Sequence, residues 1–250
     1  MTAQVATRRN IDSLSVQELT SLKTAYKKMQ GITDNRGFNY ISGFHGVTGH
    51  YCHDESPYKT FLPWHRAYLY WFELHLRDID LALAVPYWDW TSAKSHTSGI
   101  PDACRNAKEP DGSSNPLYSF VIDTPGIKRS TVRSPGIPAE LDSTDTQATP
   151  NRINELLAID DFMDFSQDLE QLPHNAIHVW VAGDMGYTNF AAFDPIFYSH
   201  HSMIDFIWLQ WQKRHGTTNI PAELLARPLA PFSMNVQDVL DISSLGYNYE

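Results

Sequence analysis

The chain has 250 residues, of which 42% are hydrophobic and 19% charged, a balance that excludes a disordered protein and allows one sizeable core. No stretch approaches the roughly 18 apolar residues of a membrane span, and the net charge of −10 argues against an extended nucleic-acid surface. We therefore expect a globular protein without nucleic-acid or membrane partners. No signal peptide is recognisable, which favours a cytoplasmic location. Eleven histidines and an aromatic content of 12% suggest a metal site walled by rings.

Apolar residues recur with helical spacing in several segments, and no run alternates as a strand would. The predicted helices cover residues 13–29, 63–80, 152–165, 172–181 and 195–213. Between residues 92 and 150 the chain is rich in Pro, Ser and Thr, which predicts an irregular surface excursion. The fold class is therefore predicted to be mainly α, a four-helix bundle with long irregular loops, in a single domain over residues 1–250.

Two histidines at helical spacing form the first candidate metal site. His174 and His178 are four residues apart, so that on a helix both rings lie on one face and can share an ion. A third ligand is expected from the last helix, where only one of the adjacent His200 and His201 can face the ion. We select His201, because Asp205 follows it by one turn and can accept a hydrogen bond there. The alternative is a set of hydrogen-bonded core histidines.

A second candidate site begins at His65, near the start of another predicted helix. Phe61 stands four residues before it, as Phe197 does before His201, so the two halves look like versions of one local arrangement. Three more histidines lie upstream on a predicted loop: His45, His50 and His53. Two of them would complete a second three-histidine site. We select His45 and His53, with His50 as the alternative to His53.

The ligand types favour copper over iron or zinc. Carboxylates are missing from the predicted ligand positions, which disfavours a di-iron site, and Asn175 occupies the place of the general base in a HExxH zinc enzyme. Two trigonal three-histidine sites with an open face suit copper that binds oxygen. The alternative is a mononuclear zinc hydrolase that uses only His174, His178 and His201.

Several runs around these histidines are specific enough to compare with known families: Phe61-Leu62-Pro63-Trp64-His65-Arg66 with Glu73, Asp194-Pro195-x-Phe197 to His201 with Asp205, His45-Gly46, Tyr51-Cys52-His53, Pro86-Tyr87-Trp88-Asp89-Trp90 and Leu172-Pro173-His174-Asn175. They resemble the copper signatures of the tyrosinase, catechol oxidase and haemocyanin family. The resemblance implies a dicopper centre inside the four-helix bundle, with two copper ions as cofactors and O2 as co-substrate. It implies these ligands: His45, His53 and His65 for the CuA ion, and His174, His178 and His201 for the CuB ion.

One position departs from the family pattern. The family usually has its second CuA histidine nine residues before the histidine of the Trp-His-Arg run, and Ser56 occupies that place here. His53 lies twelve residues before His65, so a short insertion is expected ahead of Phe61. Cys52, directly before His53, is expected to be free or in a disulfide rather than cross-linked to that histidine.

The resemblance also implies an activity, the o-hydroxylation of small monophenols and the oxidation of o-diphenols to o-quinones. Glu170 matches the family glutamate that holds a water, and Asn175 matches the asparagine that polarises it, so that together they act as a general base. The residues that correspond to the rim of the substrate pocket are Met185, Tyr187 and Thr188. Two alternatives stay open: a catechol or o-aminophenol oxidase without monophenol hydroxylation, and an oxygen carrier like haemocyanin.

The two ends of the chain carry a further part of the resemblance. Tyr247-Asn248-Tyr249 resembles the element that closes the family's catalytic domain, where an arginine, here Arg8 or Arg9, is expected to stack on a tyrosine. We expect no carboxy-terminal shielding domain and therefore no activation by proteolysis.

Overall fold

The computed structural model describes residues 5–47 and 60–250, and this part of the chain is mainly α-helical, as predicted. The α-helices are α1 (Val16–Gln30), α2 (Phe38–Ser42), α3 (Phe61–Arg77), α4 (Ala93–Ser98), α5 (Asp102–Arg105), α6 (Pro150–Leu156), α7 (Phe162–Leu169), α8 (Asn175–Val181), α9 (Thr188–Ala191), α10 (Ile196–His215) and α11 (Ala222–Leu225). The described residues also form short 3₁₀ or π helices: η1 (Ile11–Ser13), η2 (Pro138–Asp142), η3 (Glu170–His174), η4 (Gly183–Gly186) and η5 (Val236–Val239).

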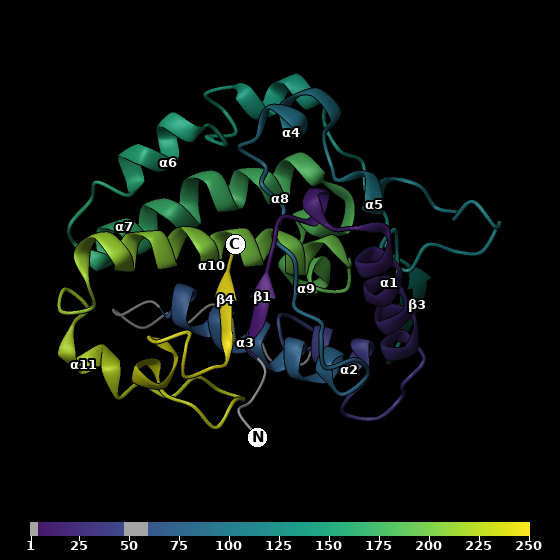
Figure 1. The fold of residues 1–250 in the computed structure, drawn as a ribbon, viewed down its shortest axis with the longest axis horizontal. Coiled ribbons are helices and arrows are strands. Elements are labelled where there is room, and N and C mark those ends of the chain that lie inside the picture. The colour runs from purple at the N-terminus through teal and green to yellow at the C-terminus, as the bar shows by residue number, and fades with distance from the viewer. Residues whose placement is uncertain (1–4, 48–59) are drawn as a thin grey trace.

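The centre of the fold is a set of long helices that run side by side. Helix α10 packs against α3, and the continuous run of α7, η3 and α8 lies along its other side (Figure 1). Both α3 and α10 are buried over most of their length. None of the helices within residues 5–47 and 60–250 combines the length and the apolar character that a membrane crossing needs.

Local capping explains where several helices begin. In α1, the Ser15 hydroxyl accepts from the Glu18 amide while the Glu18 carboxylate accepts from the Ser15 amide, which satisfies two otherwise unpaired amides. The helix predicted over residues 152–165 is wrong as one element, because it is divided into α6 and α7. Asp161 causes the break: its carboxylate accepts from the amides of Met163 and Asp164 and starts α7 afresh.

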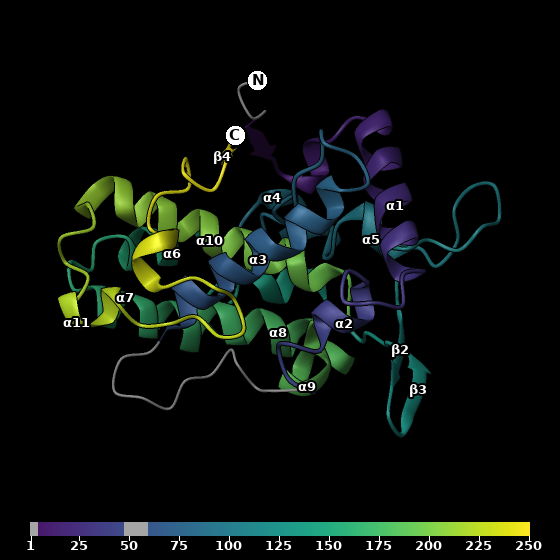
Figure 2. The same ribbon diagram turned by 90° about the horizontal axis from the view of Figure 1, so that it is seen from below.

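Within the described residues there are four short strands that the sequence pattern did not predict. They form two pairs, β1 (Ala6–Arg8) parallel to β4 (Tyr247–Tyr249), and β2 (Val121–Thr124) antiparallel to β3 (Ile127–Ser130). The first pair, with Arg8 opposite Tyr249, brings the two ends of the chain together over α10 (Figure 1). The second pair is a hairpin that extends from the helical body (Figure 2).

The excursion between residues 92 and 150 is irregular, as predicted, but it is packed onto the body. It holds α4, α5, the β2–β3 hairpin and η2, and it contributes Leu117, Ile122 and Leu141 to the core. Cys104 is buried there, and this burial raises the pKa of its thiol to about 12.

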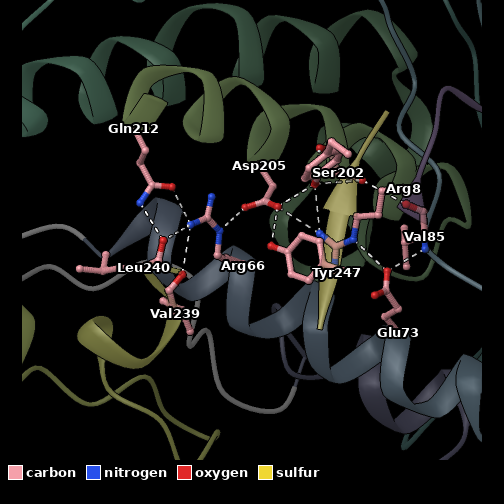
Figure 3. A network of polar contacts seen from close by, with 11 residues as sticks. Arg8, Arg66, Glu73, Val85, Ser202, Asp205, Gln212, Val239, Leu240 and Tyr247 are labelled. Atoms are coloured by element: carbon pink, nitrogen blue, oxygen red, sulfur yellow. Dashed lines mark hydrogen bonds and ion pairs between the residues drawn. The ribbon is translucent and has the colours of Figure 1, made fainter. Parts of the chain in front are cut away.

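A buried network of charges joins α3, α10 and the β1–β4 pair (Figure 3). The Asp205 carboxylate on α10 accepts from Arg66 Nε at 2.5 Å and from Arg8 Nη1 at 3.1 Å. It also accepts from the hydroxyls of Tyr247 and Tyr249, at 2.8 and 2.6 Å. Because a buried charge is tolerated only when it is paired, this one carboxylate holds four side chains from three distant segments.

Both arginines make further contacts beside those to Asp205. Arg8 Nε donates to Glu73 on α3, and the guanidinium stacks on Tyr247 with 3.7 Å to the ring centroid, which confirms the expected arginine–tyrosine contact and assigns it to Arg8. Arg66 lies 3.6 Å over the Trp208 ring and donates to Gln212 and to backbone carbonyls after η5. Both guanidiniums are therefore held from several sides.

Asp205 keeps its charge in this setting. Burial by itself raises the pKa of a carboxyl group, but the guanidiniums of Arg66 and Arg8 hold the pKa of Asp205 below its ordinary value. A depressed pKa in the folded state means that the stabilisation is present above the ordinary pKa of aspartate and is lost as the pH falls through the folded-state pKa.

We predict that Asp205→Asn destabilises the metal-free protein by about 3–5 kcal/mol, because it leaves the buried Arg66 guanidinium without a carboxylate and leaves Arg8 with Glu73 alone. Urea unfolding followed by circular dichroism measures the change. Asp123→Asn is the control, since Asp123 forms only an exposed ion pair with Lys128 and is expected to contribute less than about 1 kcal/mol. Equal losses in the two variants would contradict the prediction.

Candidate metal centre

Two groups of buried histidines lie at the centre of the helical core. One group consists of His174, His178, His200 and His201, and the other of His45, His65 and His201. Within each group the candidate ligand atoms all lie within 4.8 Å of one another. The fold thus brings together every predicted ligand that the structure describes, while His53 and its alternative His50 lie outside the described residues.

The predicted pair on one helix face lies where the helix changes its hydrogen-bond pattern. Pro173 has no amide proton to donate, and the turn that contains it, η3, is a π-helical turn. The α-helical pattern resumes directly afterwards in α8. His174 and His178 stay on the same face, with ring centroids 4.6 Å apart.

Four of the cluster histidines share one feature, a hydrogen bond from the ring Nδ1 to a backbone carbonyl. The pairs are His45 with Thr188 (2.9 Å), His65 with Phe61 (2.9 Å), His174 with Glu170 (3.1 Å) and His178 with Met185 (2.8 Å). Because a carbonyl can only accept, Nδ1 carries the proton in each neutral ring and Nε2 presents a lone pair. Histidines that ligate metals commonly make this second hydrogen bond.

The Nε2 atoms are arranged as a metal ion requires. Those of His178 and His201 are 3.2 Å apart, close to the separation of about 3.3 Å that two nitrogen ligands adopt around one ion. His174 Nε2 is buried without a hydrogen-bond partner among the described residues. Burial, reinforced by the neighbouring imidazoles, holds the pKa of His174 and of His201 well below the usual value. Neutral imidazoles with converging lone pairs fit copper.

Each cluster is braced by an aromatic ring from its own helix. Phe61 packs edge-on against His65, with centroids 4.8 Å apart, and Phe197 packs against His201 at 4.1 Å. The two halves share this Phe–His contact, as predicted, but the ring planes are 61° apart in the first pair and 32° apart in the second. His65 and His201 are themselves stacked, with centroids 4.1 Å apart and planes 13° from parallel, so the two clusters are in direct contact.

His200 lies inside the first cluster, which the sequence reasoning did not predict. Its ring is stacked on that of His174 at 5.3 Å and lies edge-on to that of His178 at 4.8 Å. Adjacent helical residues are about 100° apart, yet both rings turn toward the same two histidines. His201 is distinguished from His200 because it alone belongs to both clusters. The His-His dipeptide was the available signal.

A cavity of about 320 Å³ reaches the histidines. Its described lining is His45, His174, Asn175, His178, Val179, Met185, Gly186, Thr188 and Ala191. None of these residues is acidic or a lysine or arginine. Of the residues predicted to form the pocket rim, Met185 and Thr188 line the cavity. Tyr187 is 67% exposed and lines a neighbouring hollow with Arg129 and Phe190.

The two residues predicted to act as a general base lie next to the first cluster. Asn175 lines the cavity directly after His174. Glu170 is buried one helical turn earlier, and its backbone carbonyl is the one that orients His174.

Comparisons with known proteins agree on the family. Residues 35–214 match the model of the common central domain of tyrosinase. The chain is 34% identical to a tyrosinase of Streptomyces lincolnensis over 68% of this chain and 66% of that protein. It is 29% identical to units G and H of a Sepia officinalis haemocyanin, over 96% of this chain and 45% of that protein.

The fold agrees as well. A solved functional unit of octopus haemocyanin superposes with a TM-score of 0.80 at 29% identity, covering 98% of this chain and 68% of that one. The chain spans less than half the length of the first curated relatives. The family model covers most of the chain and includes both histidine clusters. The chain therefore belongs to the tyrosinase family of type-3 copper proteins.

Proposed function

We propose that this chain is a tyrosinase, a copper oxidase that uses O2 to o-hydroxylate monophenols and to oxidise o-diphenols to o-quinones. The cavity that reaches His45, His174 and His178 is the observation that carries the proposal. Its volume of about 320 Å³ is near the lower end of ligand pockets and suits a single aromatic ring. Because its described lining carries no acidic residue, lysine or arginine, the cavity suits a phenol whose aromatic ring bears no charged substituent.

We assign the ligands to two copper ions, with His201, which belongs to both clusters, given to the CuB ion. His174, His178 and His201 would hold the CuB ion, and His45 and His65, with His53, the CuA ion. When bound, the two ions supply two electrons to O2 together and lower the pKa of a phenol beside them. A monophenol and one O2 then yield an o-quinone and one water, whereas two o-diphenols and one O2 yield two o-quinones and two waters.

The chain itself contributes orientation and proton transfer. The four Nδ1 hydrogen bonds hold the rings of His45, His65, His174 and His178 in one tautomer, in which each neutral ring can present the lone pair of Nε2. We assign to Glu170, acting through a water polarised by Asn175, the removal of the phenol proton. The phenolate formed in this way is the electron-rich species that undergoes hydroxylation.

The competing functions make different predictions for a copper-loaded sample in air. Quinone formed from both tyramine and catechol supports the tyrosinase. Quinone from catechols or o-aminophenols alone assigns the narrower oxidase. The haemocyanin relatives favour a third outcome, reversible oxygen binding with neither substrate oxidised, and that result would overturn the proposal.

We predict two copper ions per chain in the reconstituted protein and one in His65→Ala, which also loses quinone formation. Metal analysis of desalted samples measures the stoichiometry. His75→Ala is the matched control, because His75 lies on the same helix but outside both clusters, and it is expected to keep both ions. Quinone formation retained in His65→Ala would contradict a dicopper mechanism, whereas a single metal ion in the parent together with no quinone formation would support the mononuclear zinc hydrolase.

We predict that Glu170→Gln lowers kcat for monophenols by about 100-fold or more, since it removes the general base while keeping the side-chain shape. The effect on o-diphenols is expected to be smaller, because a catechol hydroxyl is more acidic. Copper content measured in parallel is expected to stay at the parent value. Glu155→Gln, on exposed α6, serves as the control. Equal losses with both substrate classes would argue against the assigned role.

A further inference from the structure

The segment after α8 contributes one hydrogen-bond acceptor to each histidine cluster. His178 donates to the Met185 carbonyl in η4, and His45 donates to the Thr188 carbonyl at the start of α9. His65 and His174 instead donate to carbonyls of their own helical turns, four residues earlier. Residues 183–188 are called the rim segment below. They supply one acceptor to a histidine of each site, and neither acceptor lies in the same helical turn as the histidine that it orients.

The rim segment is held in place by the irregular excursion. At its start the chain reverses, with positive φ values at Ala182 (54°) and Gly183 (57°). A Cβ on Gly183 would lie 2.1 Å from the Val132 carbonyl oxygen, so the two backbones are in close contact there. The Asp184 amide donates to the same carbonyl at 2.9 Å.

The Asp184 side chain adds three further contacts, two of them to Arg129, whose side chain is 42% exposed. Its carboxylate is 3% exposed and accepts from Arg129 Nη1 at 2.8 Å, Arg129 Nη2 at 2.5 Å and the Val132 amide at 2.8 Å. Arg129 belongs to β3 of the projecting hairpin, and its guanidinium also lies 5.1 Å from the centroid of the Phe190 ring. Such two-pronged arginine–carboxylate pairs fix direction as well as distance.

The far end of the rim segment is equally constrained. A Cβ on Gly46 would lie 2.4 Å from Asn189 Cα and 2.7 Å from the Thr188 carbonyl oxygen. The backbone beside His45 thus rests directly on the end of the rim segment. A shift of this segment would displace the acceptors of His45 and His178 together.

We propose that Arg129 and Asp184 are positioning residues, which orient one histidine of each copper site through the rim segment. The ion pair holds η4 against the excursion, η4 places the Met185 and Thr188 carbonyls, and these carbonyls direct His178 Nε2 and His45 Nε2 toward the ions. The inference rests on the copper centre of the proposed function, but its first test needs no metal.

The test measures solvent exchange of the four Nδ1-bound histidine protons by proton NMR, on the whole metal-free chain. In Arg129→Met, the protons of His45 and His178 are expected to exchange about tenfold faster or more. Those of His65 and His174 are expected to keep their parent rates, because their acceptors lie within their own helical turns. These two histidines are an internal control for general loosening of the fold.

Two further variants complete the design. Lys128→Met alters the neighbouring hairpin residue, whose exposed ion pair with Asp123 does not touch the rim segment, and it is expected to change none of the four rates. Asp184→Asn keeps the side-chain shape and the Val132 contact, so it tests the ion pair if Arg129→Met folds poorly. Equal acceleration of all four protons, or of none, in the ion-pair variants would overturn the proposal.

A second readout uses the copper-loaded protein. Removal of both ions by a chelator is expected to be about tenfold faster in Arg129→Met than in the parent. Replacing a group that orients metal ligands typically weakens metal binding by about 10- to 100-fold. Faster loss of only one ion, or unchanged loss of both, would contradict a segment that serves the two sites together. Failure of the parent to bind copper would instead refute the proposed function. The proton-exchange experiment on the metal-free chain would then still test the role of Arg129 and Asp184.

Discussion

The pairing of Asp205 with two buried arginines is the constraint on which the rest of the structure depends. Arg66 directly follows His65 on α3, and Asp205 lies one turn beyond His201 on α10. Asp205 is the carboxylate partner of Arg66, and it shares Arg8 with Glu73 of α3, so these buried ion pairs fix how α3 and α10 are aligned. The same alignment stacks His65 on His201 and so brings the two histidine clusters into contact.

This core buries a group of neutral imidazoles, and backbone carbonyls accept hydrogen bonds from four of them. Each Nδ1 hydrogen bond settles the tautomer of a ring before any ion arrives. The Phe61 carbonyl belongs to α3, which the Asp205 network aligns with α10, the Glu170 carbonyl belongs to η3, and the other two belong to the rim segment. The metal centre is therefore shaped by the helical core on one side and by loops on the other, and the cavity opens where the two meet.

The parts of the fold that follow from local chemistry could be predicted from the sequence. The spacing of His174 and His178 placed both rings on one face, and the mainly α class followed from apolar periodicity. The three-residue strands β1 and β4 are too short to show alternation, and their partners are more than 200 residues apart in the chain. Only the resemblance of Tyr247-Asn248-Tyr249 to a known element indicated that the two ends of the chain meet.

Other features depend on tertiary contacts that no spacing rule contains. The inclusion of His200 in a cluster requires both α8 and α10 to be in place. The excursion over residues 92–150 was expected to be a surface feature, yet its Arg133 forms an ion pair with Asp194. The same Asp194 carboxylate accepts from the first amide of α10, so the excursion supports the start of that helix. Prolines and polar residues predict irregular backbone, but they do not indicate which helix end the backbone will support.

The central claim is that the two clusters form one coupled centre, and electron paramagnetic resonance of the copper-loaded protein tests it most directly. Each Cu(II) ion carries one unpaired electron, and two ions held by clusters whose rings stack at 4.1 Å are close enough to couple their spins. The account predicts two copper ions per chain and an integrated signal far below two spins. A full signal from two independent ions, or a single ion per chain, would contradict it.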